Sequence, residues 1–206
     1  MIEFVDYNVG LLLNALEETA QKDRTIVIFM SDHGEMLGDH GIFLKGPYMY
    51  DPLVRVPLIL CWPGHFKNGL KSEALVELID LAPTILQAVG IPVPIRMQGR
   101  SFLEICKGEA DPSVHKSHIY SEYYNAMVKH RNPTPYLTMF RDNRYKIVAY
   151  SFMDSGELYD MESDPDELDN LWDIPKYEDI RYSYLKKCLD ACVHTIDPLP
   201  ERTGNY

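Results

Sequence analysis

The sequence predicts an α/β fold, and three observations lead to this prediction. Residues 3–20 carry apolar side chains at helical spacing. A short apolar run rich in β-branched residues, Thr25-Ile26-Val27-Ile28-Phe29-Met30, follows almost at once. A helix that leads into such a strand is typical of α/β architecture. Beyond residue 108, several short strand-like runs and another helical pattern indicate a small antiparallel sheet with a helix.

The first helix is expected to bury one apolar face. Its apolar side chains recur every three or four residues. They are Phe4, Val5, Val9, Leu12, Leu13 and Leu16. The strand at residues 25–30 shows no alternation of polar and apolar residues, which suits a strand covered on both faces, as in a parallel sheet.

Three further elements are expected before residue 108. The apolar run from Val54 to Cys61 contains Pro57, which has no N–H to donate, so we expect an edge strand or one that begins after the proline. Residues 74–79 form a candidate strand. Asp80 is then a candidate cap for a helix that ends before Gly90.

The second half of the chain reads as a separate small unit. Strands are expected at residues 119–123, 136–141, 145–150 and 157–160, with Asp142-Asn143-Arg144 in a hairpin turn. A helix is expected over residues 177–193, with Leu185, Leu189 and Val193 on one side. We therefore expect residues 1–108 to be part of an α/β domain and residues 109–206 to form a small α+β subdomain.

Charge and composition limit the partners. The chain has 20 basic and 31 acidic residues, a net charge of −11, which disfavours nucleic acid as the main partner. No run of about 18 apolar residues is present, so we expect no membrane span. The N-terminus lacks a basic region followed by an apolar stretch, so no signal peptide is predicted.

The cysteines indicate neither a zinc ribbon nor a disulfide framework. There are four, Cys61, Cys106, Cys188 and Cys192, and their spacing matches no such pattern. Cys188 and Cys192 would share a helix face as half-buried thiols; a metal or redox pair is the alternative. This usage favours a reducing compartment such as the cytoplasm, although it leaves the localisation open.

The strongest chemical signal follows the first predicted strand. Polar residues at the carboxyl end of a buried strand, here Ser31-Asp32-His33-Gly34-Glu35, lie where α/β folds place their ligands. Asp32 and His33 could reach one ion through a carboxylate oxygen and an imidazole nitrogen, and Gly34 would let the backbone turn sharply. A capped turn without a ligand is the alternative.

A lysine and two possible pocket residues follow. Lys45 supplies a point charge that could hold an anionic oxygen near a metal; a solvated loop lysine is the alternative. Tyr48 and Arg55 are candidate substrate-binding residues, with ordinary packing as their alternative.

The stretch from Ser31 to Gly41, SDHGEMLGDHG, resembles the metal-binding segment of sulfatases and related phosphonate monoester hydrolases of the alkaline phosphatase superfamily. Later segments resemble that family in the same order. They are Val54-Arg55-Val56-Pro57-Leu58-Ile59, Trp62-Pro63-Gly64, Asp80-Leu81-Ala82-Pro83-Thr84, Gln98-Gly99-Arg100-Ser101 and Glu157-Leu158-Tyr159-Asp160. The resemblance covers the C-terminal part of such an enzyme and implies its mixed sheet with helices. It also implies that residues 1–108 are the C-terminal part of its α/β catalytic domain.

The resemblance also implies roles for site residues. Asp32 and His33 correspond to ligands of a divalent metal, with calcium expected and manganese possible. Lys45 corresponds to the catalytic residue that contacts the sulfate or phosphonate oxygens. The family's nucleophile, a formylglycine made within a C-x-P-S-R motif, is expected upstream and outside this chain. Cys61-Trp62-Pro63-Gly64-His65 lacks the Ser and Arg, so Cys61 is expected to be a buried thiol.

The predicted function is therefore hydrolysis of a small-molecule sulfate ester by a longer protein. This chain would supply its C-terminal portion and would be inactive without the N-terminal part. The alternatives are a phosphonate monoester or phosphodiester hydrolase, and a non-catalytic module that binds a metal or a partner. An apolar face left exposed would also favour a homo-oligomer.

Overall fold

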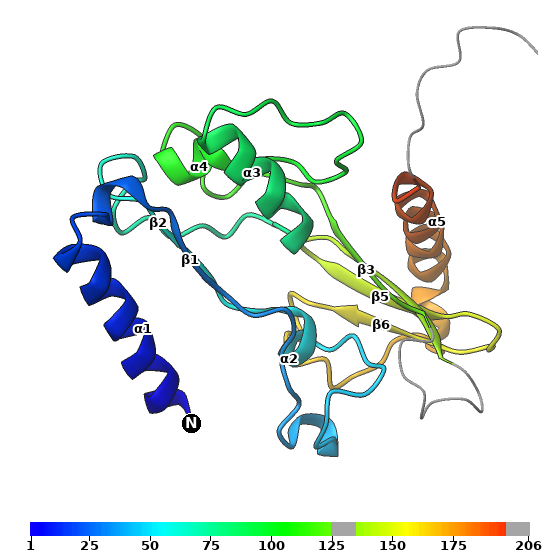
Figure 1. The fold of residues 1–206 in the computed structure, drawn as a ribbon. Coiled ribbons are helices and arrows are strands. Elements are labelled where there is room, and N and C mark those ends of the chain that lie inside the picture. The colour runs from blue at the N-terminus through cyan, green and yellow to red at the C-terminus, as the bar shows by residue number, and fades with distance from the viewer. Residues whose placement is uncertain (125–134, 197–206) are drawn as a thin grey trace, which may run out of the picture.

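The computed structural model describes residues 1–124 and 135–196 (Figure 1). Its strands form two sheets, β1-β2 and β3-β4-β5-β6. The helices and strands are α1 Ile2–Glu18, β1 Val27–Met30, α2 Asp51–Val54, β2 Leu58–Cys61, α3 Leu81–Ala88, α4 Leu103–Lys107, β3 Ile119–Tyr124, β4 Tyr136–Arg141, β5 Tyr145–Tyr150, β6 Gly156–Asp160 and α5 Glu178–His194. Short 3-10 turns lie at Lys22–Arg24, Asp39–Gly41, Leu78–Asp80 and Pro175–Tyr177. No helix in the described ranges is long and apolar enough to cross a membrane.

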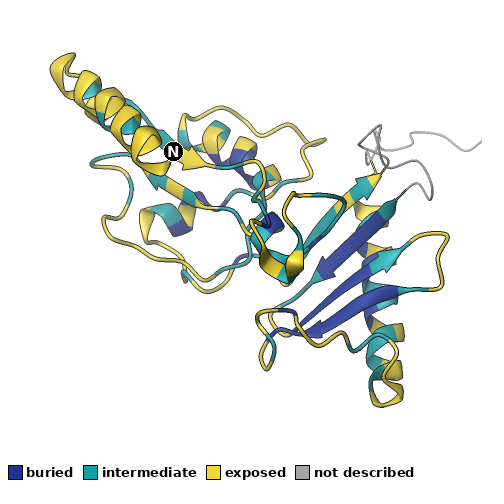
Figure 2. Cartoon of the chain, turned by 90° about the horizontal axis from the view of Figure 1, so that it is seen from below, coloured by how far each residue is buried: buried dark blue, intermediate teal, exposed yellow. Residues whose placement is uncertain are grey.

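The first helix forms where it is expected, but its apolar stripe is not buried. No residue of α1 is buried, and Phe4 and Leu12 are 71% and 69% exposed. Figure 2 shows α1 exposed along its length. Helical spacing determines which side chains share a stripe, but the covering surface must come from elsewhere, and the described residues do not provide it.

The first sheet differs from the expected parallel arrangement. β1 pairs antiparallel with β2, from Val27 opposite Cys61 to Met30 opposite Leu58. β2 begins directly after Pro57, as predicted. Phe29 and Met30 are exposed, so the described residues do not cover both faces of β1. An unbroken apolar run indicates a strand that can be buried, but it specifies neither the direction of its neighbour nor what covers it.

The strand expected at residues 74–79 is absent. Leu75 makes one isolated bridge to Lys116, and Leu78–Asp80 is a 3-10 turn. Leu81, Phe102 and Ile105 form a buried cluster with partly buried side chains of β1 and β2. This cluster fixes α3 and α4 against the first sheet.

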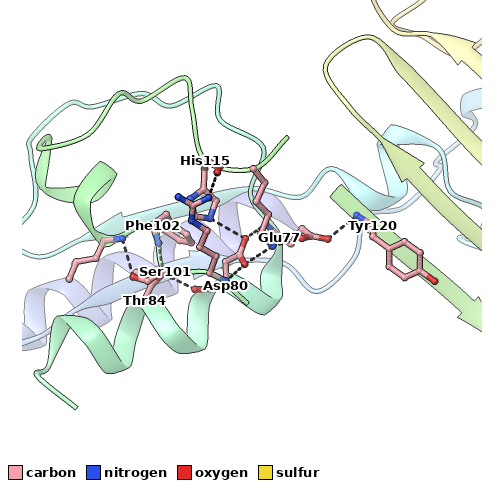
Figure 3. Close-up of polar contacts among 10 residues, drawn as sticks. Glu77, Asp80, Thr84, Ser101, Phe102, His115 and Tyr120 are labelled. Carbon is pink, nitrogen blue, oxygen red and sulfur yellow. Dashed lines mark hydrogen bonds and ion pairs between the residues drawn. The ribbon is translucent and has the colours of Figure 1, made fainter. Parts of the chain in front are cut away.

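A polar cluster around Asp80 connects this region to the second sheet (Figure 3). The Asp80 carboxylate is fully buried and accepts hydrogen bonds from the Glu77 N–H at 2.9 Å and the Arg100 N–H at 2.7 Å. Lys116 forms ion pairs with both acids, and Glu77 also accepts the Tyr120 N–H from β3. Asp80 is the N-cap residue of α3, as predicted, but its side chain caps the preceding 3-10 turn together with Glu77 and makes no capping hydrogen bond to α3.

The second sheet confirms the four predicted strands and the predicted hairpin. All of its neighbouring strands are antiparallel, and residues 142–144 form the turn between β4 and β5. Its core includes Ile147, Val148 and Leu158, which are fully buried. Figure 1 shows α5 lying along one face of this sheet.

The face that α5 presents to the sheet differs from the prediction. Tyr184, Cys188 and Ala191 are its buried residues, whereas Leu189 and Val193 are exposed. The Tyr184 ring packs edge-on against aromatic rings of β4 and β5, so aromatic contacts rather than leucine spacing orient the helix. Burial raises the pKa of the Cys188 thiol to about 12, which keeps it protonated.

The first unit also packs on the second sheet. Met49 and Val54 contact Leu137, Met139 and Val148. α2 therefore belongs to the first unit in sequence but lies against β4 and β5. The division at residue 108 stays a prediction, because part of the packing crosses it.

Candidate metal and anion site

The loop after β1 is shaped by local hydrogen bonds. The Ser31 hydroxyl donates to the His33 carbonyl at 2.7 Å, and the His33 N–H donates to Asp32 Oδ1 at 2.9 Å. Ser and Asp favour such turns because their short side chains reach nearby backbone groups. The outer carboxylate oxygen of Asp32 and the His33 ring remain accessible at the end of β1.

Gly34 is needed here for a reason that differs from the predicted one. Its backbone is not in the left-handed region, so it makes no turn that only glycine allows. A Cβ at this position would instead lie 1.8 Å from the Pro52 carbonyl oxygen. The Gly34 N–H also donates to the Leu53 carbonyl at 2.8 Å. Close approach of α2 therefore requires the glycine.

The hydrogen bonds of His33 determine its tautomer. Nδ1 lies 2.8 Å from the Gly34 carbonyl, which can only accept, so Nδ1 carries the proton. Nε2 then presents a lone pair and lies 2.6 Å from the Lys45 ammonium, which donates to it. Asp32 Oδ2 is 3.9 Å from the same nitrogen. The structure thus brings together the three residues predicted for metal and anion binding.

This donor set fits a divalent metal. A ligating histidine commonly donates its other ring N–H to a backbone carbonyl, as His33 does. The Asp32 carboxylate and the His33 Nε2 lone pair are donors that a divalent metal accepts, and a metal at Nε2 would take the place that the Lys45 ammonium holds. Residues 1–124 and 135–196 contain no group of three or more His, Cys, Asp or Glu side chains able to hold a metal, so Asp32 and His33 would be only part of a complete ligand set.

The five predicted site residues border one broad pocket. Asp32, His33, Lys45, Tyr48 and Arg55 all line it. Aromatic rings pack next to the segment that carries Lys45. The Tyr48 ring lies against Gly46, Tyr48 stacks on Tyr50, and Tyr50 stacks on His40 with ring centroids 4.0 Å apart. Burial and the nearby Glu157 carboxylate raise the pKa of Tyr50 above its ordinary value, so its hydroxyl stays protonated.

The pocket wall is richer in cations than the protein as a whole. Lys and Arg outnumber Asp and Glu among the lining residues, although the chain carries a net charge of −11. Among these, sequence reasoning missed Lys67, Lys71 and Lys116. These lysines are scattered along the chain and match no motif, so only the fold could reveal that they share a wall. Lys116 is ion-paired with Glu77 and Asp80, and Arg141 is ion-paired with Asp51. The suitability of this wall for an anionic substrate therefore rests on its other lysines and arginines.

Cys61 differs from its prediction without becoming a nucleophile candidate. It is exposed at the end of β2, not buried, and it is a free thiol like the other three cysteines. Alternation along β2 places Cys61 on its exposed side.

Comparison with known proteins identifies the family. A family model described as N-sulphoglucosamine sulphohydrolase, C-terminal, matches residues 38–194. The chain belongs to this sulfatase family. It is 36% identical over 175 residues to the N-acetylglucosamine-6-O-sulfatase of Bacteroides thetaiotaomicron, covering 84% of this chain and 31% of that protein. It is 37% identical over 203 residues to arylsulfatase K of Homo sapiens, covering 95% of this chain and 35% of that protein.

Solved structures agree with the sulfatase assignment and confirm the predicted fold class. BT4656 in complex with its substrate D-glucosamine-2-N,6-O-disulfate superposes with a TM-score of 0.84 at 28% identity, covering 98% of this chain and 41% of that chain. The phosphonate monoester hydrolase of Agrobacterium radiobacter gives a TM-score of 0.84 at 28% identity, covering 96% and 40%. The chain spans about a third of the length of the N-acetylglucosamine-6-O-sulfatase and of arylsulfatase K. The metal-ligand and substrate roles of its residues stay predictions.

Proposed function

We propose that this chain is the C-terminal portion of a metal-dependent sulfatase that hydrolyses sulfate esters. The observation that supports this most is the convergence of Asp32, His33 and Lys45 at the end of β1. The names of the relatives support sulfate-ester chemistry, since they include an N-acetylglucosamine-6-O-sulfatase and arylsulfatases.

Each residue then has a defined task. Asp32 would offer a carboxylate oxygen and His33 would offer Nε2 to the metal, for which calcium is our first proposal and manganese the second. Bound there, the metal would stabilise negative charge on the substrate oxygens. Lys45 would hold an oxygen of the sulfate group and offset the charge that builds up during its transfer. Tyr48 and Arg55 border the space in which the substrate would lie.

The nucleophile would come from another part of the protein. By the family resemblance it would be a formylglycine located upstream of this chain. We therefore expect this chain alone to be inactive. For the substrate we propose a sulfated sugar, because the printed substrate of BT4656 is a disulfated glucosamine and because lysines and arginines enrich the pocket wall.

Replacing Lys45 by Ala tests this function in the complete protein that contains the chain. We expect turnover of an aryl sulfate to fall by about two to three orders of magnitude, because one preorganised charge on the transferred group is lost. Metal binding, measured by calorimetry, should persist because Asp32 and His33 remain.

The matched control is Lys186→Ala, which removes an exposed lysine on α5. It should leave turnover unchanged. Wild-type turnover in Lys45→Ala would show that Lys45 has no catalytic role.

A second candidate function is phosphonate monoester hydrolysis. Two phosphonate monoester hydrolases, from Agrobacterium radiobacter and Silicibacter pomeroyi, superpose with TM-scores of 0.84 and 0.82. Comparing kcat/KM on an aryl sulfate and on an aryl phosphonate monoester separates the two functions. A protein that binds metal but turns over neither compound would favour the third alternative, a non-catalytic binding module.

A further inference from the structure

A buried ionic network lies beneath α2. It consists of Asp51, Arg141, Lys146 and Glu167, and we call it the Lys146 network. The Lys146 and Glu167 side chains are 0% and 1% exposed, with Nζ and Oε1 2.5 Å apart. Lys146 Nζ also lies 3.0 Å from Asp51 Oδ1, and Arg141 Nη1 lies 2.6 Å from the same oxygen. The network therefore joins α2 to β4, β5 and the segment after β6.

The charged groups of this network lose their hydration when they are buried, so the network adds little net stability to the fold. Desolvating two buried charges often cancels the attraction between them, so a well-packed apolar pair is commonly as stable. Glu167 also has a φ of 58°, a left-handed conformation that is unfavourable for a residue with a side chain. Burial alone would raise the pKa of Asp51, but Lys146 and Arg141 outweigh it and hold the pKa below its usual value. Such a charged arrangement fixes geometry more clearly than it adds stability.

The network controls where α2 begins. Glu167 Oε2 accepts the Asp51 N–H at 2.6 Å, while Arg141 and Lys146 hold the Asp51 carboxylate. α2 is only four residues long, so fixing its first residue fixes the whole turn.

The other side of α2 holds the candidate metal loop. The Leu53 carbonyl accepts the Gly34 N–H at 2.8 Å, and the Pro52 carbonyl occupies the space that a Cβ of Gly34 would need. Gly34 is adjacent to His33 and its carbonyl accepts the Nδ1–H, which sets the tautomer that presents a lone pair at Nε2. An unbroken series of contacts thus runs from Lys146 and Glu167 through α2 to the imidazole.

We propose that Lys146 and Glu167 are positioning residues that hold the Asp32-His33-Gly34 loop in place through α2. The catalytic consequence rests on the proposed function, whereas the effect on the loop itself does not. The small C-terminal sheet would then contribute to the site without any of these network residues contacting the metal.

The test uses the double variant Lys146→Met/Glu167→Leu in the complete protein. Both charges are removed together, so no unpaired buried charge is left and the fold should survive. We expect faster hydrogen–deuterium exchange in residues 31–37, with unchanged exchange in α3 and α5. Metal affinity should fall by about tenfold or more, as for other residues that orient a ligand. The kcat should fall with a smaller change in KM.

Two further variants keep the test decisive. Asp51→Asn, at a partly accessible position, should give the same local pattern if the double variant fails to fold. Lys186→Met/Asp190→Leu removes an exposed pair of the same charges on α5 and should change nothing. Unchanged exchange in residues 31–37, or an equal rise throughout the chain, would overturn the proposal. If the wild-type protein has no turnover but the double variant still exchanges faster than wild type only in residues 31–37, the proposed function alone is refuted.

Discussion

Single contacts define the candidate site. The Nδ1–H of His33 is committed to the Gly34 carbonyl, so Nε2 alone remains for a cation. Gly34 matters because a carbonyl oxygen of α2 occupies the position of its missing Cβ. Neither fact follows from the residue types alone. Both depend on the contact between the loop after β1 and α2. A substitution that adds a single carbon atom at Gly34 can test this contact.

Gly34→Ala adds only a methyl group at the point of closest approach. The Cβ would lie 1.8 Å from a backbone oxygen, so the loop or α2 must move. We expect a loss of about 1–3 kcal/mol of unfolding free energy, measured by urea denaturation of the complete protein. Metal affinity should fall as well.

Gly10→Ala is the matched control for this substitution. Gly10 lies inside α1, with no atom within 4 Å of the position of a Cβ. It should be neutral or stabilise by up to about 1 kcal/mol, because alanine favours helix. Equal stability of the Gly34→Ala variant and the wild type would show that the loop tolerates displacement.

At the scale of elements, the turn between β4 and β5 connects the sheet to α5. Asp142 accepts the N–H groups of Arg144 and Tyr145, both at 3.0 Å, within the turn. It also accepts the Tyr184 hydroxyl at 2.6 Å and contacts Lys187 at 3.2 Å, both from α5. Burial raises the pKa of Asp142, but these hydrogen bonds outweigh it and lower the pKa below the usual value.

This shift has a defined sign. Because the folded pKa is lower than the unfolded one, the carboxylate stabilises the fold fully above the unfolded pKa, and the gain is lost as pH falls through the folded value. Asp142→Asn should therefore lower the free energy of unfolding by about 1–3 kcal/mol at pH 7. The difference from wild type should shrink in acid. Denaturation series at pH 7 and pH 3 measure this, and a difference independent of pH would refute the role of the charge.

At the scale of the whole molecule, the exposed stripe of α1 is an unusual surface. Phe4, Leu12 and other apolar side chains of α1 are exposed, and so are Phe29 and Met30 on β1. Exposed apolar patches of this kind promote association. The 206-residue chain expressed by itself should therefore self-associate, in line with the predicted homo-oligomer.

Sedimentation velocity over a range of concentrations tests this expectation. Phe4→Glu/Leu12→Glu should reduce self-association, since it places charge on the stripe without disturbing buried contacts. Asn14→Glu adds charge to α1 at an exposed polar position and should have little effect. A wild-type chain that stays monomeric at every concentration would contradict the prediction.

The sequence by itself determined the elements with strong local signals. Helical spacing predicted α1 and α5, a β-branched run predicted β1, short strand-like runs predicted β3–β6, and Pro57 placed the start of β2. It also determined the family, because SDHGEMLGDHG and the ordered motifs after it are local strings of residues. Asp32, His33 and Lys45 were found in the same way, and the structure places them in contact.

Only the tertiary structure decided what each surface contacts. β1 pairs antiparallel with β2, and a turn held by Asp80 stands where a strand was expected at residues 74–79. α5 packs on the sheet through its buried Tyr184. The tertiary structure also brought Lys146 and Glu167 under α2, next to a loop more than 100 residues away in sequence. Spacing along a chain records local geometry, whereas burial and pairing depend on neighbours from distant segments.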